Sequence, residues 1–226
     1  NDNTQKHYSE KLLLMNYLPM IYPKPHTTKK LSEDELNKKN IYSCPQTLFK
    51  IHPDFDQIIF DILEKDKKGI IYLIKDSNKV WYKKLIKRLS TNKKYDSKKI
   101  IFIDPLNYED YLLHLGRSSV LLDPLYYGAG NSFFESMLFG TPTITFPTDH
   151  IKSRLVLGAY KQMEIKNPPI ATSIQNYIDL AVKYASRDDL SALKNNYKTA
   201  AEKKLFNTKK AGEEFNKIMT NLFNLT

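Results

Sequence analysis

Residues 123–135 read Asp123-Pro124-Leu125-Tyr126-Tyr127-Gly128-Ala129-Gly130-Asn131-Ser132-Phe133-Phe134-Glu135, and this stretch is the best guide to the fold. It leads from the end of a predicted strand into a predicted helix. The chain has seven glycines in 226 residues, and two of them fall within three positions here. Such spacing indicates backbone that adopts positive φ or closely approaches another group. In open parallel sheets, loops of this kind bind ligands beyond the carboxyl ends of the strands.

Two interpretations of this loop are open from the local pattern. In the first, Gly128–Asn131 present main-chain N–H groups to a pyrophosphate, Ser132 adds a hydroxyl at the helix start, and Glu135 points toward ribose hydroxyls. In the second, Ser132-x-x-Glu135 is a capping box that satisfies two free amides of the helix. The loop has neither the Gly-x-Gly-x-x-Gly of dinucleotide sites nor the Gly-Lys-Ser/Thr of a P-loop.

Working outward, short apolar runs alternate with amphipathic stretches, which is typical of βαβ units and a parallel sheet. The runs mostly lack alternation because helices would cover both faces of the strands. We therefore predict an α/β fold with a Rossmann-like parallel sheet flanked by helices. The predicted strands are Ile41–Cys44, Ile70–Lys75, Ile100–Ile103, Val120–Asp123 and Thr143–Phe146. The predicted helices are Phe55–Lys65, Val80–Leu89, Tyr108–Leu115, Ser132–Phe139 and Ile151–Met163, with a helical region from Ile174 to the end of the chain.

Composition narrows the class of protein. The net charge of +10 comes mainly from Lys, but runs such as Lys93-Lys94 and Lys98-Lys99 are short and interrupted by Asp. This pattern favours a solvated surface, and we expect no nucleic-acid partner. No apolar run approaches the roughly 20 residues of a membrane span. A single cysteine, Cys44, excludes an internal disulfide framework and fits a cytoplasmic location.

The loop and its surroundings resemble the C-terminal catalytic domain of the O-GlcNAc transferase and SPINDLY family, in its bacterial form. The resemblance covers most of the chain from His7 to about Ala185. It rests on Asp123-Pro124, Gly128-Ala129-Gly130-Asn131-Ser132, Glu135, Gly140-Thr141-Pro142 and Pro147, with further matches at His7–Leu12, Cys44–Pro53, Ser153-Arg154 and Tyr160–Met163. The sequence departs from eukaryotic members, which carry His-Thr-Thr at positions 130–132 and Asp at position 135.

The resemblance implies the C-terminal half of a GT-B fold, which holds a UDP-sugar donor and needs no metal or other cofactor. Residues 1–226 would form this domain, with a lead-in over 1–38 and C-terminal helices over 174–226. Its N-terminal partner domain, which would carry much of the acceptor site and a catalytic histidine, has no counterpart here. The polar start of the chain, without Met, suggests a piece of a longer protein. The implied reaction is inverting transfer to a protein Ser or Thr, or to another acceptor.

The resemblance also nominates site residues. Lys50 is the candidate catalytic residue, because it inherits the position of a lysine that reaches the donor diphosphate. Tyr111 and His114 offer rings for stacking on uracil near Leu106, although packing is the default role of such residues. Arg154 contacts phosphate or forms a salt bridge. With the loop residues, the candidate donor-binding set is Gly128, Ala129, Gly130, Asn131, Ser132, Glu135, Leu106, Tyr111, His114 and Arg154.

A rival interpretation makes the chain an inactive nucleotide-binding or protein-interaction module. His52 is not assigned a catalytic role, because no nucleophile partner is evident in the sequence.

Overall fold

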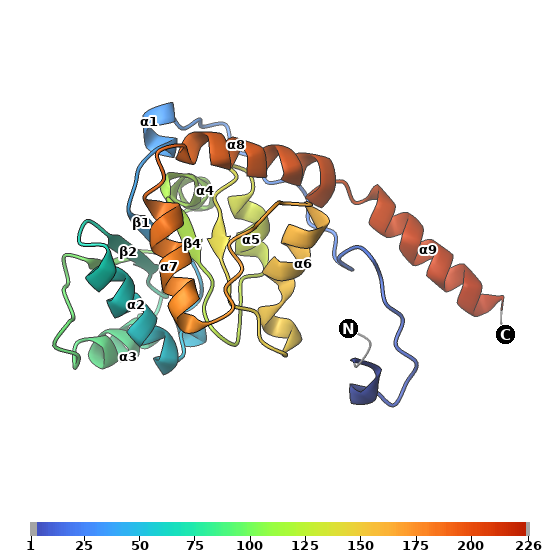
Figure 1. Cartoon of the computed structure of the whole chain (residues 1–226), viewed down its shortest axis with the longest axis horizontal. Coiled ribbons are helices and arrows are strands. Elements are labelled where there is room, and N and C mark those ends of the chain that lie inside the picture. The colour runs from blue at the N-terminus through green and yellow to red at the C-terminus, as the bar shows by residue number, and fades with distance from the viewer. Residues whose placement is uncertain (1–3, 225–226) are drawn as a thin grey trace.

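A computed structural model describes residues 4–224 and contains one five-stranded parallel sheet (Figure 1). Its strands are β1 (Ile41–Cys44), β2 (Ile70–Ile74), β3 (Ile100–Ile103), β4 (Val120–Leu122) and β5 (Thr143–Ile144). They lie in the order β3-β2-β1-β4-β5. The chain winds outward from β1 to β3 and then crosses to β4, so the strand order reverses between β1 and β4. This is the point at which open α/β sheets bind ligands.

Helices cover both faces of the sheet. Helix α7 lies in front of the sheet in Figure 1 and packs against α2, whereas α4 lies behind it and packs against α5. The connecting helices are α2 (Pro53–Lys65), α3 (Val80–Leu89), α4 (Tyr108–Arg117), α5 (Asn131–Ser136), α6 (Leu155–Gln162) and α7 (Ile174–Ala185), with short 3-10 turns η2 (Leu48–Lys50) and η3 (Ile151–Ser153). The predicted Rossmann-like architecture is confirmed.

Two hydrophobic clusters hold these layers together. The larger one joins β1, β2 and β4 to α2 and α7, and its fully buried members include Tyr42, Phe55 and Tyr177. The second joins α5, α6 and α8 around Phe133 and Tyr160, whose rings meet edge to face at 5.2 Å between centroids. The loop after β4 lies where these clusters meet, so packing fixes it from both sides.

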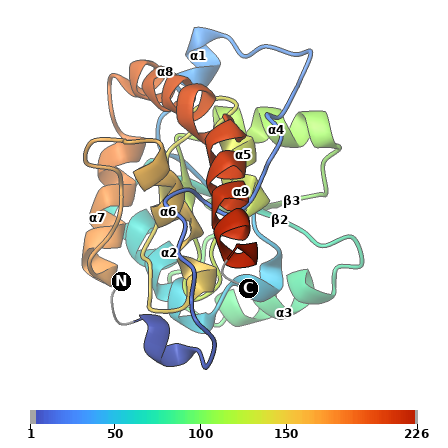
Figure 2. The same cartoon turned by 90° about the vertical axis from the view of Figure 1, so that its right-hand side faces the viewer.

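The ends of the chain leave this body on the same side (Figure 1). The C-terminal region forms α8 (Leu190–Ala200), the π-helical turn η4 (Ala201–Leu205) and α9 (Lys209–Phe223), and α9 projects away from the sheet. The N-terminal region contains η1 (Thr4–His7) and α1 (Glu33–Leu36), and α1 packs against α8 (Figure 2). Residues 1–3 of the predicted lead-in and residues 225–226 of the predicted C-terminal helices lie outside the described residues.

The sequence predictions differ from the structure at element ends. Strands β1 and β3 have the predicted bounds, and the others end one or two residues earlier. The helix predicted over Ser132–Phe139 ends at Ser136, because residues 137–139 tighten into turns before Gly140, which has a φ of 70°. The helix predicted over Ile151–Met163 is divided at Arg154 into η3 and α6. Among the described residues, no helix is both long and apolar enough to cross a membrane.

Candidate functional site

A cleft of about 770 Å³ opens beyond the carboxyl ends of β1 and β4. Nine of the eleven predicted site residues line it, including Lys50 from the loop after β1 and the whole of Gly128–Ser132 from the loop after β4. His114 and Arg154 are not part of the lining. The complete lining is Pro45, Gln46, Thr47, Lys50, Leu106, Tyr108, Tyr111, Tyr127, Gly128, Ala129, Gly130, Asn131, Ser132, Glu135, Ile151, Lys152 and Leu155.

The start of the glycine loop is fixed by the buried carboxylate of Asp123. One carboxylate oxygen accepts from the N–H of Ala129 at 2.5 Å, and the other accepts from the Thr145 hydroxyl at 2.6 Å. A Cβ at Gly128 would come within 2.9 Å of this carboxylate, so only glycine fits there without a shift. Burial raises the pKa of Asp123 to about 6, although these hydrogen bonds and the charge of Lys50 act in the opposite direction.

The N–H groups along the loop divide into two sets. Gly128 donates to the carbonyl oxygen of Lys152 at 2.9 Å and Ala129 donates to Asp123, so these two groups are used inside the protein. This corrects the expectation that every N–H group from Gly128 to Asn131 faces a ligand. Within residues 4–224, the N–H groups of Gly130, Asn131 and Ser132 find no acceptor. A Cβ at Gly130 would meet no heavy atom within 4 Å, which leaves the loop open to the cleft here.

The capping-box interpretation is wrong. The N-cap of α5 is Gly130, and no side chain caps this helix. The Ser132 hydroxyl instead accepts a short hydrogen bond from the Gln46 amide, and the Glu135 carboxylate accepts from the Tyr22 hydroxyl at 2.9 Å. Both side chains are therefore held by distant parts of the chain, and both line the cleft.

Lys50 is the partly buried cation of the site. Its ammonium group donates to the Gln46 side-chain oxygen at 3.0 Å and lies 4.4 Å from the centre of the Tyr127 ring. Burial lowers the pKa of Lys50, while the nearby charge of Asp123 raises it. Lys152 approaches the same ring at 5.4 Å. In the described part of the chain neither lysine forms a direct ion pair with a carboxylate, and both approach the Tyr127 ring on one side of the cleft.

The predicted base-binding residues have different environments. Leu106 lines the cleft and is partly exposed, and the ring of Tyr111 lies beside it at the cleft wall. Burial and the charge of Glu135 raise the pKa of Tyr111 above its usual range. His114 points elsewhere, because its Nε2 lies 3.0 Å from the Ser43 hydroxyl and its ring packs edge to face on Tyr72. Its expected role in stacking on a base is thus corrected to one of packing, and burial lowers its pKa to about 4.

Arg154 also has a local role. Its guanidinium donates to the carbonyl oxygen of Thr148 at 2.9 Å, and its main chain joins η3 to α6. This bond fixes the loop that carries Ile151 and Lys152 to the cleft. The salt bridge proposed for Arg154 is not found among the described residues.

The structure adds residues that sequence reasoning missed: Gln46, Tyr127, Lys152 and Tyr22. Gln46 precedes Lys50 by four positions and bridges it to Ser132, a spacing that was visible in the sequence. Tyr22 gave no local signal, because its partner Glu135 lies 113 positions away.

Among the described residues, no cluster of three His, Cys, Asp or Glu side chains is placed to hold a metal ion.

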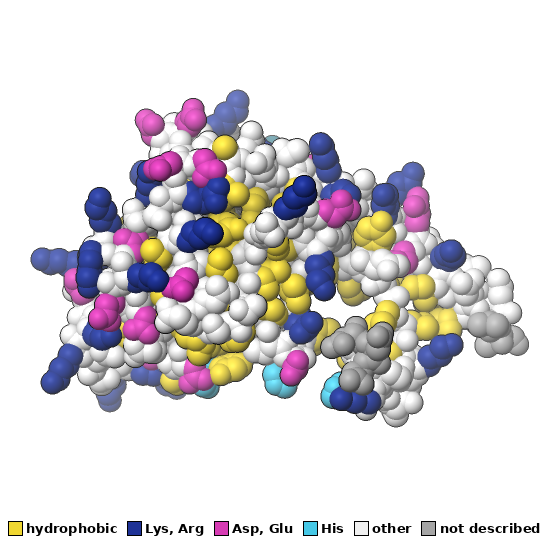
Figure 3. All heavy atoms as spheres, viewed as in Figure 1, with side chains coloured by type: hydrophobic (Ala, Val, Ile, Leu, Met, Phe, Trp, Pro, Cys, Tyr) yellow, Lys and Arg dark blue, Asp and Glu magenta, His cyan; other side chains and the backbone are white. Residues whose placement is uncertain are grey.

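Charge on the surface is mixed. Lys and Arg side chains lie among Asp and Glu side chains over the face drawn in Figure 3. Several lysines of the described residues form exposed ion pairs, such as Lys65 with Asp179 and Lys94 with Glu64. On this face the positive side chains do not gather into one patch, in keeping with a solvated surface.

Comparison with known protein families places this cleft in context. The model of the family "Glycosyl transferase family 41" matches residues 24–215, which includes every residue of the cleft. The chain belongs to glycosyl transferase family 41. Search of curated protein sequences gives no match.

Solved structures agree with this family 41 domain in fold. A mutant of the Thermobaculum terrenum O-GlcNAc transferase aligns with a TM-score of 0.65 and 18% identity, covering 82% of this chain and 34% of that one. A mutant of S. aureus TarM, in complex with Fondaparinux, alpha-GlcNAc-glycerol and UDP, aligns with a TM-score of 0.62 and 16% identity, covering 97% of this chain and 41% of that one. Sucrose-phosphate synthase from Thermosynechococcus elongatus aligns with a TM-score of 0.52 and 14% identity, covering 84% and 47%.

These alignments confirm the predicted fold class. The five-stranded parallel sheet with its flanking helices matches the C-terminal domains of GT-B glycosyltransferases. The family 41 chain spans about a third of the length of the O-GlcNAc transferase that it matches.

Proposed function

We propose that this chain is the donor-binding domain of a glycosyltransferase and that its cleft binds a UDP-sugar. The observation that carries the proposal is the convergence of three kinds of group on one cleft. Lys50 supplies a cation, Gly130–Ser132 supply unpaired N–H groups, and Glu135 supplies a carboxylate. These groups complement a diphosphate and the hydroxyls of a ribose. The resemblance favours UDP over GDP.

The proposed role of Lys50 is electrostatic. When a glycosyl bond to a nucleoside diphosphate breaks, negative charge develops on the departing phosphate oxygen. An ammonium group that already points into the cleft stabilises this charge without having to reorganise. Such preorganised electrostatic stabilisation is the usual source of large rate effects. Gln46 holds Lys50 toward the cleft, and the N–H groups of Gly130–Ser132 bind the remaining phosphate oxygens. We propose that no metal takes part and that Lys152 adds a second, exposed positive charge.

The acceptor side lies outside this cleft in our proposal. The solved O-GlcNAc transferase is about three times as long as the segment that this chain aligns with. A second Rossmann-like domain would face the cleft and bring the acceptor, a protein Ser or Thr hydroxyl or another hydroxyl, with the base that activates it. The proposed reaction is inverting transfer, and the expected location is the cytoplasm.

Calorimetric titration of the chain with UDP, with GDP as the control nucleotide, tests this function. We expect micromolar to millimolar UDP binding that weakens at least tenfold in Lys50→Ala and Glu135→Ala, because each variant removes a charged partner. The matched control is Lys65→Ala, which removes an exposed lysine whose partner is Asp179 and which does not line the cleft. UDP binding that is equal in all these proteins, or no UDP binding, would contradict the proposed donor site.

A further inference from the structure

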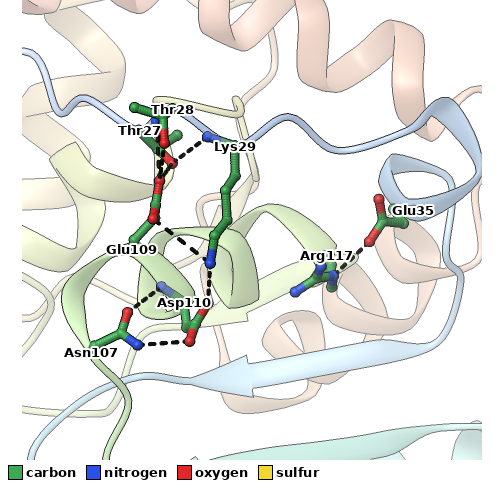
Figure 4. Close-up of polar contacts among 8 residues, drawn as sticks. All are labelled: Thr27, Thr28, Lys29, Glu35, Asn107, Glu109, Asp110 and Arg117. Carbon is green, nitrogen blue, oxygen red and sulfur yellow. Dashed lines mark hydrogen bonds and ion pairs between the residues drawn. The ribbon is translucent and has the colours of Figure 1, made fainter.

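The segment over residues 16–29, here called the strap, is fastened to the domain at both ends. At its start, the N–H of Leu18 donates to the Gln162 side chain of α6 at 2.9 Å. Near its end, the hydroxyls of Thr27 and Thr28 both donate to Glu109 of α4 at 2.8 Å. Figure 4 shows these two threonines and Lys29 converging on the start of α4. The threonine bonds lower the pKa of Glu109 to about 2, so this anchor stays charged at neutral pH.

Further contacts press the strap onto the second hydrophobic cluster. Leu18, Met20 and Tyr22 pack against it, and Lys24 pairs with Glu202 of η4 at 2.7 Å. Gly158 on α6 makes room for the strap, since a Cβ there would come within 2.9 Å of the Leu18 side chain. The strap is therefore an integral layer of the domain across α5 and α6.

Between its two anchors, the strap places one side chain against the candidate site. The ring of Tyr22 stacks on Phe134 with 5.0 Å between centroids and 20° between planes. Its hydroxyl donates to one oxygen of Glu135 at 2.9 Å. Burial, followed by the hydrogen bond to Glu135 and its charge, raises the pKa of Tyr22 above its usual range, so the hydroxyl remains a donor at neutral pH.

We propose that Tyr22 is a positioning residue for Glu135 and that the strap thereby forms part of the ribose subsite of the donor cleft. This inference rests on the proposed function. Tyr22 occupies one carboxylate oxygen of Glu135 and fixes the rotamer of the side chain, while the ring stacking fixes Tyr22 itself. Tyr111 also lies against this carboxylate, and burial together with the charge of Glu135 raises the pKa of Tyr111. The carboxylate oxygen that Tyr22 leaves open then accepts from a ribose hydroxyl. Pre-organisation of this kind strengthens binding because less side-chain freedom is lost when the ligand arrives.

The test removes only the hydroxyl of Tyr22. Tyr22→Phe keeps the ring on Phe134 and deletes the bond to Glu135. The matched control is Tyr184→Phe in α7. It also deletes one tyrosine hydroxyl bond, the one to the carbonyl oxygen of Asn167, and Tyr184 does not line the cleft. Each protein is titrated with UDP and with 2′,3′-dideoxy-UDP, which has the same diphosphate and base but no ribose hydroxyls for Glu135 to accept from.

We expect Tyr22→Phe to weaken UDP binding by about three- to tenfold and to leave binding of the dideoxy nucleotide unchanged, while Tyr184→Phe changes neither. A merely structural role would weaken both nucleotides equally, and that result overturns the inference, as does wild-type affinity of Tyr22→Phe for UDP. If wild-type protein binds UDP and the dideoxy nucleotide equally, the ribose contact fails while the diphosphate site stands. If wild-type protein binds neither, the proposed function fails and the inference falls with it.

Discussion

Two lysines at opposite ends of the sheet are both withdrawn from water, yet they have different partners. At the amino end of the strands, Lys194 is 1% exposed and donates to the carbonyl oxygens of Leu36 and Gly116 at 2.9 and 2.7 Å. At the carboxyl end, Lys50 is partly buried and has one side-chain acceptor, Gln46. Burial lowers the pKa of both, to about 7 for Lys194.

The glycines at the two ends differ in the same way. Gly140 has a φ of 70°, and a Cβ there would lie 1.8 Å from the carbonyl oxygen of Lys194. Gly130 faces open space. Burial, lowered pKa and glycine content are thus common to both ends and do not identify a site. The distinguishing feature of the carboxyl end is a set of N–H groups, those of Gly130, Asn131 and Ser132, for which residues 4–224 supply no acceptor.

The largest difference in stability should come from adding one methyl group to the glycine at each end of the sheet, Gly140 and Gly130. Gly140→Ala should lower the free energy of unfolding by about 3–5 kcal/mol, because the methyl group meets backbone and the residue is held at positive φ. Gly130→Ala should change it by less than about 1 kcal/mol, since the added methyl group meets no atom. Urea unfolding followed by circular dichroism measures both. Equal losses in the two variants would break the comparison.

Lys194, at the amino end of the strands, should make the stability of the protein depend on pH. Its pKa falls from 10.5 in the unfolded chain to about 7 in the folded protein, so the unfolded state binds more protons between these values. Stability from this group therefore rises with pH, by about 2 kcal/mol between pH 7 and 9. We expect this rise in wild-type protein relative to Lys194→Met, measured as free energies of urea unfolding. Parallel curves for the two proteins would show that Lys194 keeps its ordinary pKa.

The smallest effect is expected from a substitution of Gln46, at the carboxyl end of the strands. Gln46→Met keeps a side chain of similar length but removes the bonds to Lys50 and Ser132. We expect UDP affinity to fall by about fivefold, as one positioning interaction is lost, with little change in stability. Calorimetry measures the affinity, and Gln57→Met on the exposed face of α2 is the control. Unchanged UDP affinity would mean that Lys50 reaches the ligand without this support.

Much of the fold was predictable because it depends on local pattern. The run Ile100–Ile103 is apolar and rich in β-branched residues, Ile41–Cys44 is short and mostly apolar, and both form strands with the predicted bounds. Helices α2 and α4 follow from apolar spacing that matches the helical period. The division of the region 151–163 at Arg154 was missed, since the break depends on a bond to Thr148 outside the helical pattern.

The candidate site was predictable in position but not in detail. Its place at the loop after β4 follows from the glycine pair and the general behaviour of parallel sheets. The sequence did not decide between a ligand loop and a capping box, because the partners of Ser132 and Glu135 are Gln46 and Tyr22, far away in the chain. His114 was misassigned for a similar reason: the direction of its ring depends on contacts with Ser43 and Tyr72 on neighbouring strands.

The most direct test of the account is an NMR titration of the isotope-labelled chain with UDP, followed through the amide signals of the glycine loop. The account predicts that the N–H signals of Gly130, Asn131 and Ser132 move most, because these groups gain phosphate acceptors, and that signals around Lys194 stay in place. Ligand-induced shifts that centre away from the loop, or amides of Gly130–Ser132 that do not respond to saturating UDP, would contradict the claim that this end of the sheet is built to receive a nucleoside diphosphate.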